Sequence, residues 1–284
     1  MSPPARRRGR ATGRPAPYLV GSLRDAFDAW LEATVARFLP PLSFPELRRG
    51  VQALSSLYVE RRAEGRLAER ALEGAGKPAA FACFYAPLHF LTLHHALAAA
   101  GGLDPGAPPA RIADLGCGTG AAGASLAARF ARRPPVLGID RSGFALGEAR
   151  HTYRAFGAPA RTRRGVPPAA APSPRAGDLW CLGWTVNECA PGAADALLAR
   201  VAHALGRGVG LVVAEPLAGP ATPFWRAWQG ALAPAGVAAH EVAVRIELPP
   251  FLAKLDRAAG LDHRTLGARL LVRAPSPSDP RGSP

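Results

Sequence analysis

The stretch from residue 111 to residue 120, RIADLGCGTG, constrains the fold of this chain more than any other. An apolar run that favours a β-strand leads into three glycines, Gly116, Gly118 and Gly120, and an alanine-rich segment that favours a helix follows. Glycine permits a sharp turn from strand to helix and lets a ligand approach the backbone closely. The stretch therefore predicts a βα unit whose turn lies against a nucleotide-like ligand.

Short apolar runs and amphipathic runs alternate from this turn onward, which is the pattern of a mainly parallel α/β sheet. The last two expected strands lack the earlier spacing and predict an edge pair resembling a hairpin. A short edge strand is also expected within 157–177, although this segment is rich in proline and arginine. Strands are expected at 111–116, 135–140, 178–184, 208–216, 240–248 and 268–274, and helices at 121–132, 142–156, 192–205, 223–233 and 250–260.

The segments outside this pattern define the expected domain organisation. Residues 1–17 form a basic, proline-rich tail, 18–107 a helical region, 108–274 the α/β domain and 275–284 a second tail. Within the helical region, Ser43 and Glu46 have the spacing of a capping box at a helix start. The helix that follows is expected to continue through residues 65–74, and Pro87 is expected to break or kink the next one.

Asp114 lies two residues before the first glycine, at the carboxyl end of the first expected strand. A dinucleotide would place its anionic pyrophosphate over this turn, where a carboxylate repels it. S-adenosylmethionine would place an amine and a sulfonium there instead. The sign of the charge at Asp114 therefore favours S-adenosylmethionine over a nicotinamide dinucleotide.

Asp140 ends the next expected strand, 20 residues past Gly120. A carboxylate at this place can accept hydrogen bonds from both ribose hydroxyls, in either cofactor. No Gly-Lys-Ser/Thr sequence follows the turn, so a P-loop is excluded.

Two longer stretches, ADLGCGTGAAGASLA and VLGIDRSGFALGEAR, resemble the first two motifs of the class I S-adenosylmethionine-dependent methyltransferases. GDLWCLGWTVNE and VGLVVAEP resemble that family's fourth and fifth strands. The resemblance covers roughly residues 108–274 and implies a Rossmann-like methyltransferase fold with an antiparallel last strand, and S-adenosyl-L-methionine as cofactor. No acid lies between Glu148 and Asp178, where the family often places one near the adenine, so the adenine contacts stay unassigned. The cofactor-binding residues that the resemblance implies are Asp114, Gly116, Cys117, Gly118, Gly120, Asp140 and Arg141.

A second resemblance lies upstream. LSSLYVERR and AAFACFYAPLHFLTLHHAL are similar to segments of the methyltransferase-like proteins associated with the small ribosomal subunit. Those proteins have clustered cysteines that are missing here, so no iron–sulfur cluster is implied. The four cysteines contain no C-x-x-C pair, and neither a zinc site nor a disulfide framework is predicted.

Substrate contacts are expected at the end of the fourth strand, because ligands lie beyond the carboxyl ends of strands in open α/β sheets. Trp184 can stack on a base or cover the cofactor, Asn187 can bind an acceptor, and Glu188 can take its proton. The structural alternatives are packing for Trp184 and helix capping for Asn187 and Glu188. Glu215 either lines the cleft or ends its strand. The histidines at positions 89, 94 and 95 are predicted to be core or boundary residues.

The net charge of +14 is concentrated in two stretches without acids, residues 1–24 and 149–177, each with six arginines. Such stretches attract polyanions, so RNA or a ribosomal component is an expected partner and methyl acceptor. The alternatives are a small-molecule acceptor and a catalytically inactive ribosome-assembly module. No secretory signal or membrane span is predicted, and the cysteine content fits a reducing compartment, the cytoplasm.

Overall fold

The computed structural model describes residues 15–60, 76–217 and 222–277. The expected helix continuation at 65–74 lies outside these ranges, as do most of the two expected tails. Ala16 exchanges backbone hydrogen bonds with Arg245 and Glu247. Residues 15–17, the last three of the predicted tail, thus contact the chain around the end of β6 (Ala238–Arg245).

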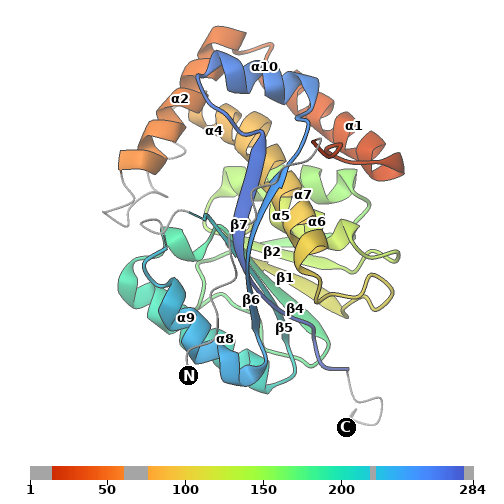
Figure 1. The fold of residues 1–284 in the computed structure, drawn as a ribbon, viewed down its shortest axis with the longest axis vertical. Coiled ribbons are helices and arrows are strands. Elements are labelled where there is room, and N and C mark those ends of the chain that lie inside the picture. The colour runs from red at the N-terminus through yellow and green to blue at the C-terminus, as the bar shows by residue number, and fades with distance from the viewer. Residues whose placement is uncertain (1–14, 61–75, 218–221, 278–284) are drawn as a thin grey trace.

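A seven-stranded sheet forms the centre of the molecule, in the order β3-β2-β1-β4-β5-β7-β6 (Figure 1). β7 runs antiparallel to both β5 and β6, and the other described pairings are parallel. This arrangement confirms the predicted Rossmann-like methyltransferase fold with its antiparallel last strand. The strands are β1 (Arg111–Leu115), β2 (Val136–Asp140), β3 (Ala160–Arg164), β4 (Asp178–Gly183), β5 (Gly210–Glu215), β6 (Ala238–Arg245) and β7 (Thr265–Arg273).

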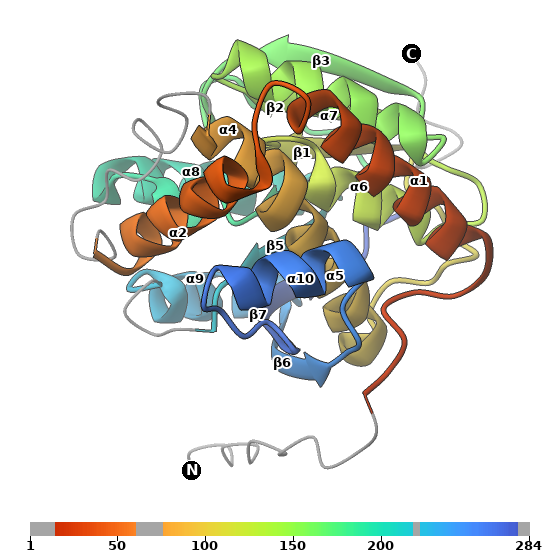
Figure 2. The same ribbon diagram turned by 90° about the horizontal axis from the view of Figure 1, so that it is seen from above.

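Burial of the strands follows their place in the sheet. Every residue of β5 is buried, and so is nearly every residue of β1 and β4, because helices cover both faces of these central strands. The expected edge strand is present as β3, and its residues are largely exposed. Figure 2 shows β3 and β6 at opposite sides of the molecule.

The helices cover both faces of the sheet, and each face has its own hydrophobic core. α5 (Ala86–Ala100), α6 (Ala121–Ala128) and α7 (Gly143–Ala155) pack on one face. α8 (Pro191–Gly206) and α9 (Trp225–Leu232) pack on the other face, around the buried indole of Trp180.

A helical cap lies over the carboxyl ends of the parallel strands (Figure 1). The helix predicted to start at Ser43 is α2 (Phe44–Glu60), and the predicted contact is present. The Glu46 carboxylate accepts hydrogen bonds from the Ser43 backbone N–H at 2.8 Å and from the Ser43 hydroxyl at 2.6 Å. Pro87 does not break the chain's helical path. A π-helical turn, η2 (Phe81–Tyr85), leads directly into α5, with Pro87 in its first turn, where a missing N–H costs little. The cap helices are α1 (Gly21–Phe38), α2 (Phe44–Glu60), α4 (Gly76–Ala80) and α10 (Pro250–Ala258).

Candidate functional site

A cavity of about 290 Å³ lies at the carboxyl ends of β1, β2 and β4, beneath the helical cap. Its floor is the turn between β1 and α6, and one side is the turn between β2 and α7. Residues 165–167, which follow β3, form a further wall. Residues 183–185 and 188–190, at and after the end of β4, form another. Phe81 of η2 and His89 of α5 contribute from the cap side.

The glycine turn requires glycine at each of its three positions for a physical reason. Gly116, Gly118 and Gly120 have φ of 71°, 50° and 81°, in the left-handed region that side chains disfavour. A Cβ on Gly116 would also lie 2.5 Å from the Thr185 side chain. Gly120 is the N-cap of α6. The turn thus presents bare backbone to the cavity.

Asp140 joins the glycine turn to the neighbouring turn. Its carboxylate accepts hydrogen bonds from the backbone N–H of Gly118, at 3.0 Å, and of Ser142, at 2.8 Å. The Ser142 hydroxyl in turn caps α7 by accepting from Ala145 at 3.2 Å. Asp140 lies in the cavity wall, and a carboxylate has lone pairs left for further donors.

The prediction that the Asp114 carboxylate faces a ligand bound at the glycine turn is wrong. Asp114 is 1% exposed, and its carboxylate points beneath α6, where it accepts from Gly123 N–H at 2.9 Å and from the Tyr153 hydroxyl at 2.8 Å. Only glycine fits at position 123, because a Cβ there would lie 2.3 Å from that carboxylate. Burial raises the pKa of Asp114 to about 6. Asp114 supports the turn from behind and is not in the cavity wall.

Glu188 is the second carboxylate in the cavity wall. It ends a short 3-10 helix, η3 (Val186–Glu188), that follows β4. Burial raises its pKa to about 7, the negative charge of Asp140 adds to the rise, and Arg141 opposes it. Arg141 and the buried Cys117 also lie in the wall, so of the seven residues predicted to bind the cofactor, five line the cavity directly. These five are Gly116, Cys117, Gly118, Asp140 and Arg141.

Trp184 stacks on His89 at the edge of the cavity. Their ring centroids are 4.0 Å apart, and the planes differ by 5°. Trp184 has φ of 56°, which is rare for a bulky residue and is a form of strain found at ligand sites. Burial, and secondarily His263, lowers the pKa of His89 to about 3, so the ring is neutral. His89 was predicted to be a core or boundary residue; it is half-buried, and it also lines the cavity, which was not predicted.

Asn187 and Glu215 lie behind the wall. Glu215 ends β5, is fully buried, and accepts hydrogen bonds from the backbone N–H of Val186 at 2.8 Å and of Asn187 at 3.4 Å. Burial raises its pKa well above the usual range. Glu215 therefore holds η3 in place. The buried Asn187 side-chain oxygen has no hydrogen-bond partner among the described residues.

Sequence reasoning missed an apolar wall beside Asp140. Phe144 and Val166 have exposed fractions of 36% and 58%, and both line the cavity with Ala145. Val166 belongs to the proline-rich segment after β3, which has no recognisable motif. Phe144 follows a cap residue and looks like an ordinary helix residue in the sequence.

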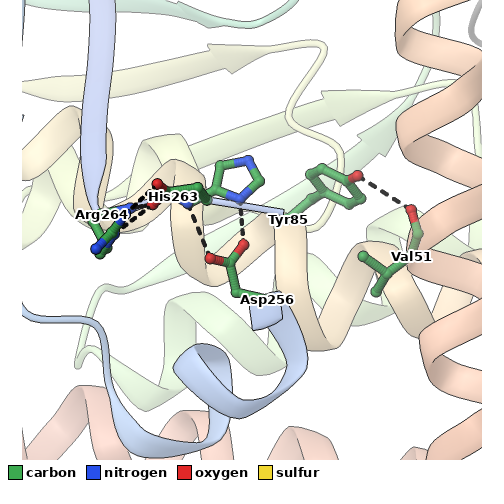
Figure 3. Close-up of polar contacts among 6 residues, drawn as sticks. Val51, Tyr85, Asp256, His263 and Arg264 are labelled. Atoms are coloured by element: carbon green, nitrogen blue, oxygen red, sulfur yellow. Dashed lines mark hydrogen bonds and ion pairs between the residues drawn. The ribbon is translucent and has the colours of Figure 1, made fainter. Parts of the chain in front are cut away.

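Hydrogen bonds tie the cap helices to neighbouring segments (Figure 3). The Tyr85 hydroxyl donates to the Val51 carbonyl at 3.3 Å and ties η2 to α2. Asp256 of α10 binds both the backbone N–H of His263, at 3.0 Å, and its imidazole Nδ1, at 2.6 Å. These contacts link η2 to α2, and α10 to the residues just before β7.

No family model matches the chain, and no curated protein matches it. Solved structures with similar folds include an O-methyltransferase family protein from Burkholderia thailandensis, 15% identical, with a TM-score of 0.49 over 81% of this chain and 72% of that one. An O-methyltransferase from neocarzinostatin biosynthesis, in complex with S-adenosylmethionine and 2-hydroxy-5-methyl naphthoic acid, is 18% identical, with a TM-score of 0.47 over 80% and 69%. The 1,6-didemethyltoxoflavin-N1-methyltransferase of Burkholderia thailandensis is 15% identical, with a TM-score of 0.40 over 67% and 79%. All three are methyltransferases, and the likeness is one of fold.

No helix in the described ranges is long and apolar enough to cross a membrane.

Proposed function

We propose that this protein is an S-adenosylmethionine-dependent methyltransferase. The observation that carries the proposal is the cavity between the glycine turn and Asp140, with two carboxylates, Asp140 and Glu188, in its wall. Its volume of about 290 Å³ is close to the lower end of small-molecule sites, about 300–1,000 Å³. The two carboxylates suit a ligand that carries a sulfonium and an ammonium group.

The residues present fit each part of that cofactor. The Asp140 carboxylate accepts two backbone N–H groups, and its remaining lone pairs can accept hydrogen bonds from both ribose hydroxyls. Phe144 and Val166 offer the apolar surface that an adenine ring requires. The bare backbone at Gly116 and Gly118 allows close approach of the methionine end, and Glu188 provides a negative charge for the sulfonium.

Methyl transfer makes few chemical demands on the protein. The bound cofactor supplies a methyl group already activated by the sulfonium, so alignment of the acceptor provides much of the acceleration. Trp184 and His89 form a flat, neutral wall against which an acceptor can be oriented. Glu188, with its pKa of about 7, can accept a proton from the acceptor at neutral pH.

The rival cofactor, a nicotinamide dinucleotide, fits the wall less well. Its pyrophosphate would lie over the glycine turn, near the Glu188 carboxylate, which repels it when ionised. A catalytically inactive module would share the fold and the cavity, and it differs only in turnover.

Calorimetry with S-adenosylmethionine, S-adenosylhomocysteine and NAD tests the proposal. We expect the two sulfur compounds to bind and NAD not to bind. Gly118→Val, which fills the floor of the cavity, should abolish the heat, whereas Gly192→Ala on α8, where a Cβ meets nothing within 4 Å, should not. Binding of NAD alone, or no heat with any of the three, would refute the proposal.

Transfer is tested separately from binding. Incubation with tritiated S-adenosylmethionine and a cell lysate, followed by separation into RNA, protein and small-molecule fractions, identifies the acceptor class. Cofactor binding without label in any fraction would favour the inactive module.

A further inference from the structure

Six exposed arginines gather at the β3 side of the molecule, on β2, β3 and α7 or directly next to them. We call this set the arginine edge. Its members are Arg141, Arg150, Arg154, Arg161, Arg163 and Arg164. They come from three elements that pack together, since β2 pairs with β3 and α7 packs on both. The positive charge is therefore concentrated in space as well as in sequence.

Arg141 interacts with Glu188 in the cavity wall, but the other five arginines of the edge have few acids near them in the sequence. Between residues 141 and 177 the sequence has one acid, Glu148, and its carboxylate is bound to Arg37 at 2.5 Å. Hydrogen bonds from Arg150 and Arg164 go to neutral oxygens. Arg150 donates to the Thr162 hydroxyl at 2.7 Å, and Arg164 to the carbonyl of Arg141 at 3.0 Å. Such contacts orient a guanidinium but leave its charge for an anionic partner.

The arginine edge leads to the mouth of the cavity. Arg164 lies opposite Asp140 in the register of β3 against β2, and the three residues after it, 165–167, line the cavity. Arg141 lines the cavity as well. A polymer held along β3 would thus pass the opening.

The surface around the arginines fits a nucleic acid better than a membrane. Peripheral membrane binding combines basic residues with apolar side chains that insert into the bilayer. Only three large apolar side chains are exposed in the described part of the chain, and two of them, Phe144 and Val166, belong to the cavity wall. The third, Val20, precedes α1 and lies outside the arginine edge.

We propose that the arginine edge binds the phosphate backbone of RNA and directs an unpaired segment of it toward the cavity. Guanidinium groups pair well with phosphates, and such contacts position a polymer without reading its sequence. The choice of RNA rests on the proposed function: an acceptor atom must reach a cavity under the cap, and the loops and bulges of RNA offer unstacked nucleotides that a DNA duplex does not.

Salt-dependent binding to a labelled stem-loop RNA tests the proposal without cofactor. Three variants, Arg150→Gln, Arg154→Gln and Arg161→Gln, are combined. The matched control combines Arg207→Gln, Arg226→Gln and Arg257→Gln, exposed arginines on or next to α8, α9 and α10, with the same change in charge. Thermal unfolding verifies that both triple variants are folded.

We expect the edge variant to lose about tenfold or more in RNA affinity, and the slope of log K against log salt to fall by about 2, at about 0.7 per lost phosphate contact. The control should bind like the parent protein. Equal losses in both variants, tighter binding to a DNA duplex of the same sequence, or comparable binding to phosphatidylserine vesicles would each overturn the proposal. Calorimetry with S-adenosylhomocysteine on the same samples tests the cavity separately, so RNA binding and cofactor binding can fail independently.

Discussion

The Tyr153 hydroxyl donates a hydrogen bond of 2.8 Å to the Asp114 carboxylate, behind the glycine turn that borders the cavity. Tyr153 belongs to α7 and Asp114 to β1, and both are fully or almost fully buried. The same carboxylate oxygen accepts the Gly123 N–H of α6. One buried acid therefore connects a strand with the two helices that follow the cofactor-side turns.

Tyr153→Phe should destabilise the protein by roughly 1–3 kcal/mol, because it leaves a buried carboxylate with one donor fewer. Urea unfolding measures this loss. Tyr18→Phe is the matched control: its hydroxyl also bonds a carboxylate, that of Asp28, whose side chain is 44% exposed and can turn to water instead. Equal losses in the two variants would mean that burial of the Asp114 pair has no special role.

Asp114→Asn should change how stability depends on pH. Burial raises the pKa of Asp114 from 3.8 to about 6, so the folded state holds a proton that the unfolded state has released between these values. The contribution of Asp114 to stability therefore falls as pH rises from about 4 to about 6, by an amount on the order of 3 kcal/mol. The asparagine variant lacks this loss because its amide does not titrate, and its oxygen can still accept the two hydrogen bonds. Unfolding of both proteins at pH 4.5 and pH 7.5 gives the comparison; a constant difference would show that Asp114 titrates normally.

Gly123→Ala and Gly147→Ala should have opposite effects, although both place alanine in a helix. At position 123 the new Cβ would lie 2.3 Å from the Asp114 carboxylate, which Tyr153 holds in place, and we expect a loss of roughly 1–3 kcal/mol. At position 147 nothing lies within 4 Å, and alanine should stabilise α7 by up to about 1 kcal/mol. Thermal melts of the two variants decide the matter. A stabilised Gly123→Ala variant would contradict the close packing of α6 on Asp114.

The sequence was sufficient to predict the parts of the site that depend on local backbone geometry. Gly116, Gly118 and Gly120 have positive φ, which glycine tolerates best, and Asp140 is the last residue of β2. The direction of the Asp114 side chain could not be predicted in this way. It depends on Gly123 and Tyr153, which come from two different helices and meet only after these helices pack on the sheet.

The stack of His89 on Trp184 was out of reach of the sequence for the same reason. His89 lies on α5, far from Trp184 along the chain. The same helix carries His94 and His95, and the sequence alone does not indicate which of the three histidines lies in the site. Of that pair, His95 bonds the carbonyl of Tyr18 at 2.8 Å, and neither lines the cavity. Only the packing of α5 against the end of β4 distinguishes the three histidines.

Asp140→Ala should weaken S-adenosylhomocysteine binding by roughly 10- to 100-fold, the equivalent of losing hydrogen bonds to a charged group. The variant also removes the acceptor of the Gly118 and Ser142 N–H groups, so a lower melting temperature is expected alongside. Asp262→Asn, which affects an exposed carboxylate paired with Arg264, serves as the control and should leave affinity unchanged. Unaltered affinity in Asp140→Ala, with the protein folded, would remove the ribose assignment.

Glu188 should make the preference for S-adenosylmethionine over S-adenosylhomocysteine depend on pH. The two ligands differ by the sulfonium charge, and the pKa of Glu188 is about 7. Below this value the side chain is neutral and the preference is small; above it the carboxylate is ionised and attracts the sulfonium. The ratio of the two affinities should therefore rise between pH 6 and pH 8, by up to about tenfold for each unit by which the bound sulfonium lowers the pKa of Glu188.

Glu188→Gln should give a ratio that does not change with pH. Asp195→Asn, which changes an exposed acid on α8, should retain the pH dependence of the parent protein. Because the ratio cancels effects common to both ligands, a flat ratio in the parent protein would mean that Glu188 does not face the sulfonium.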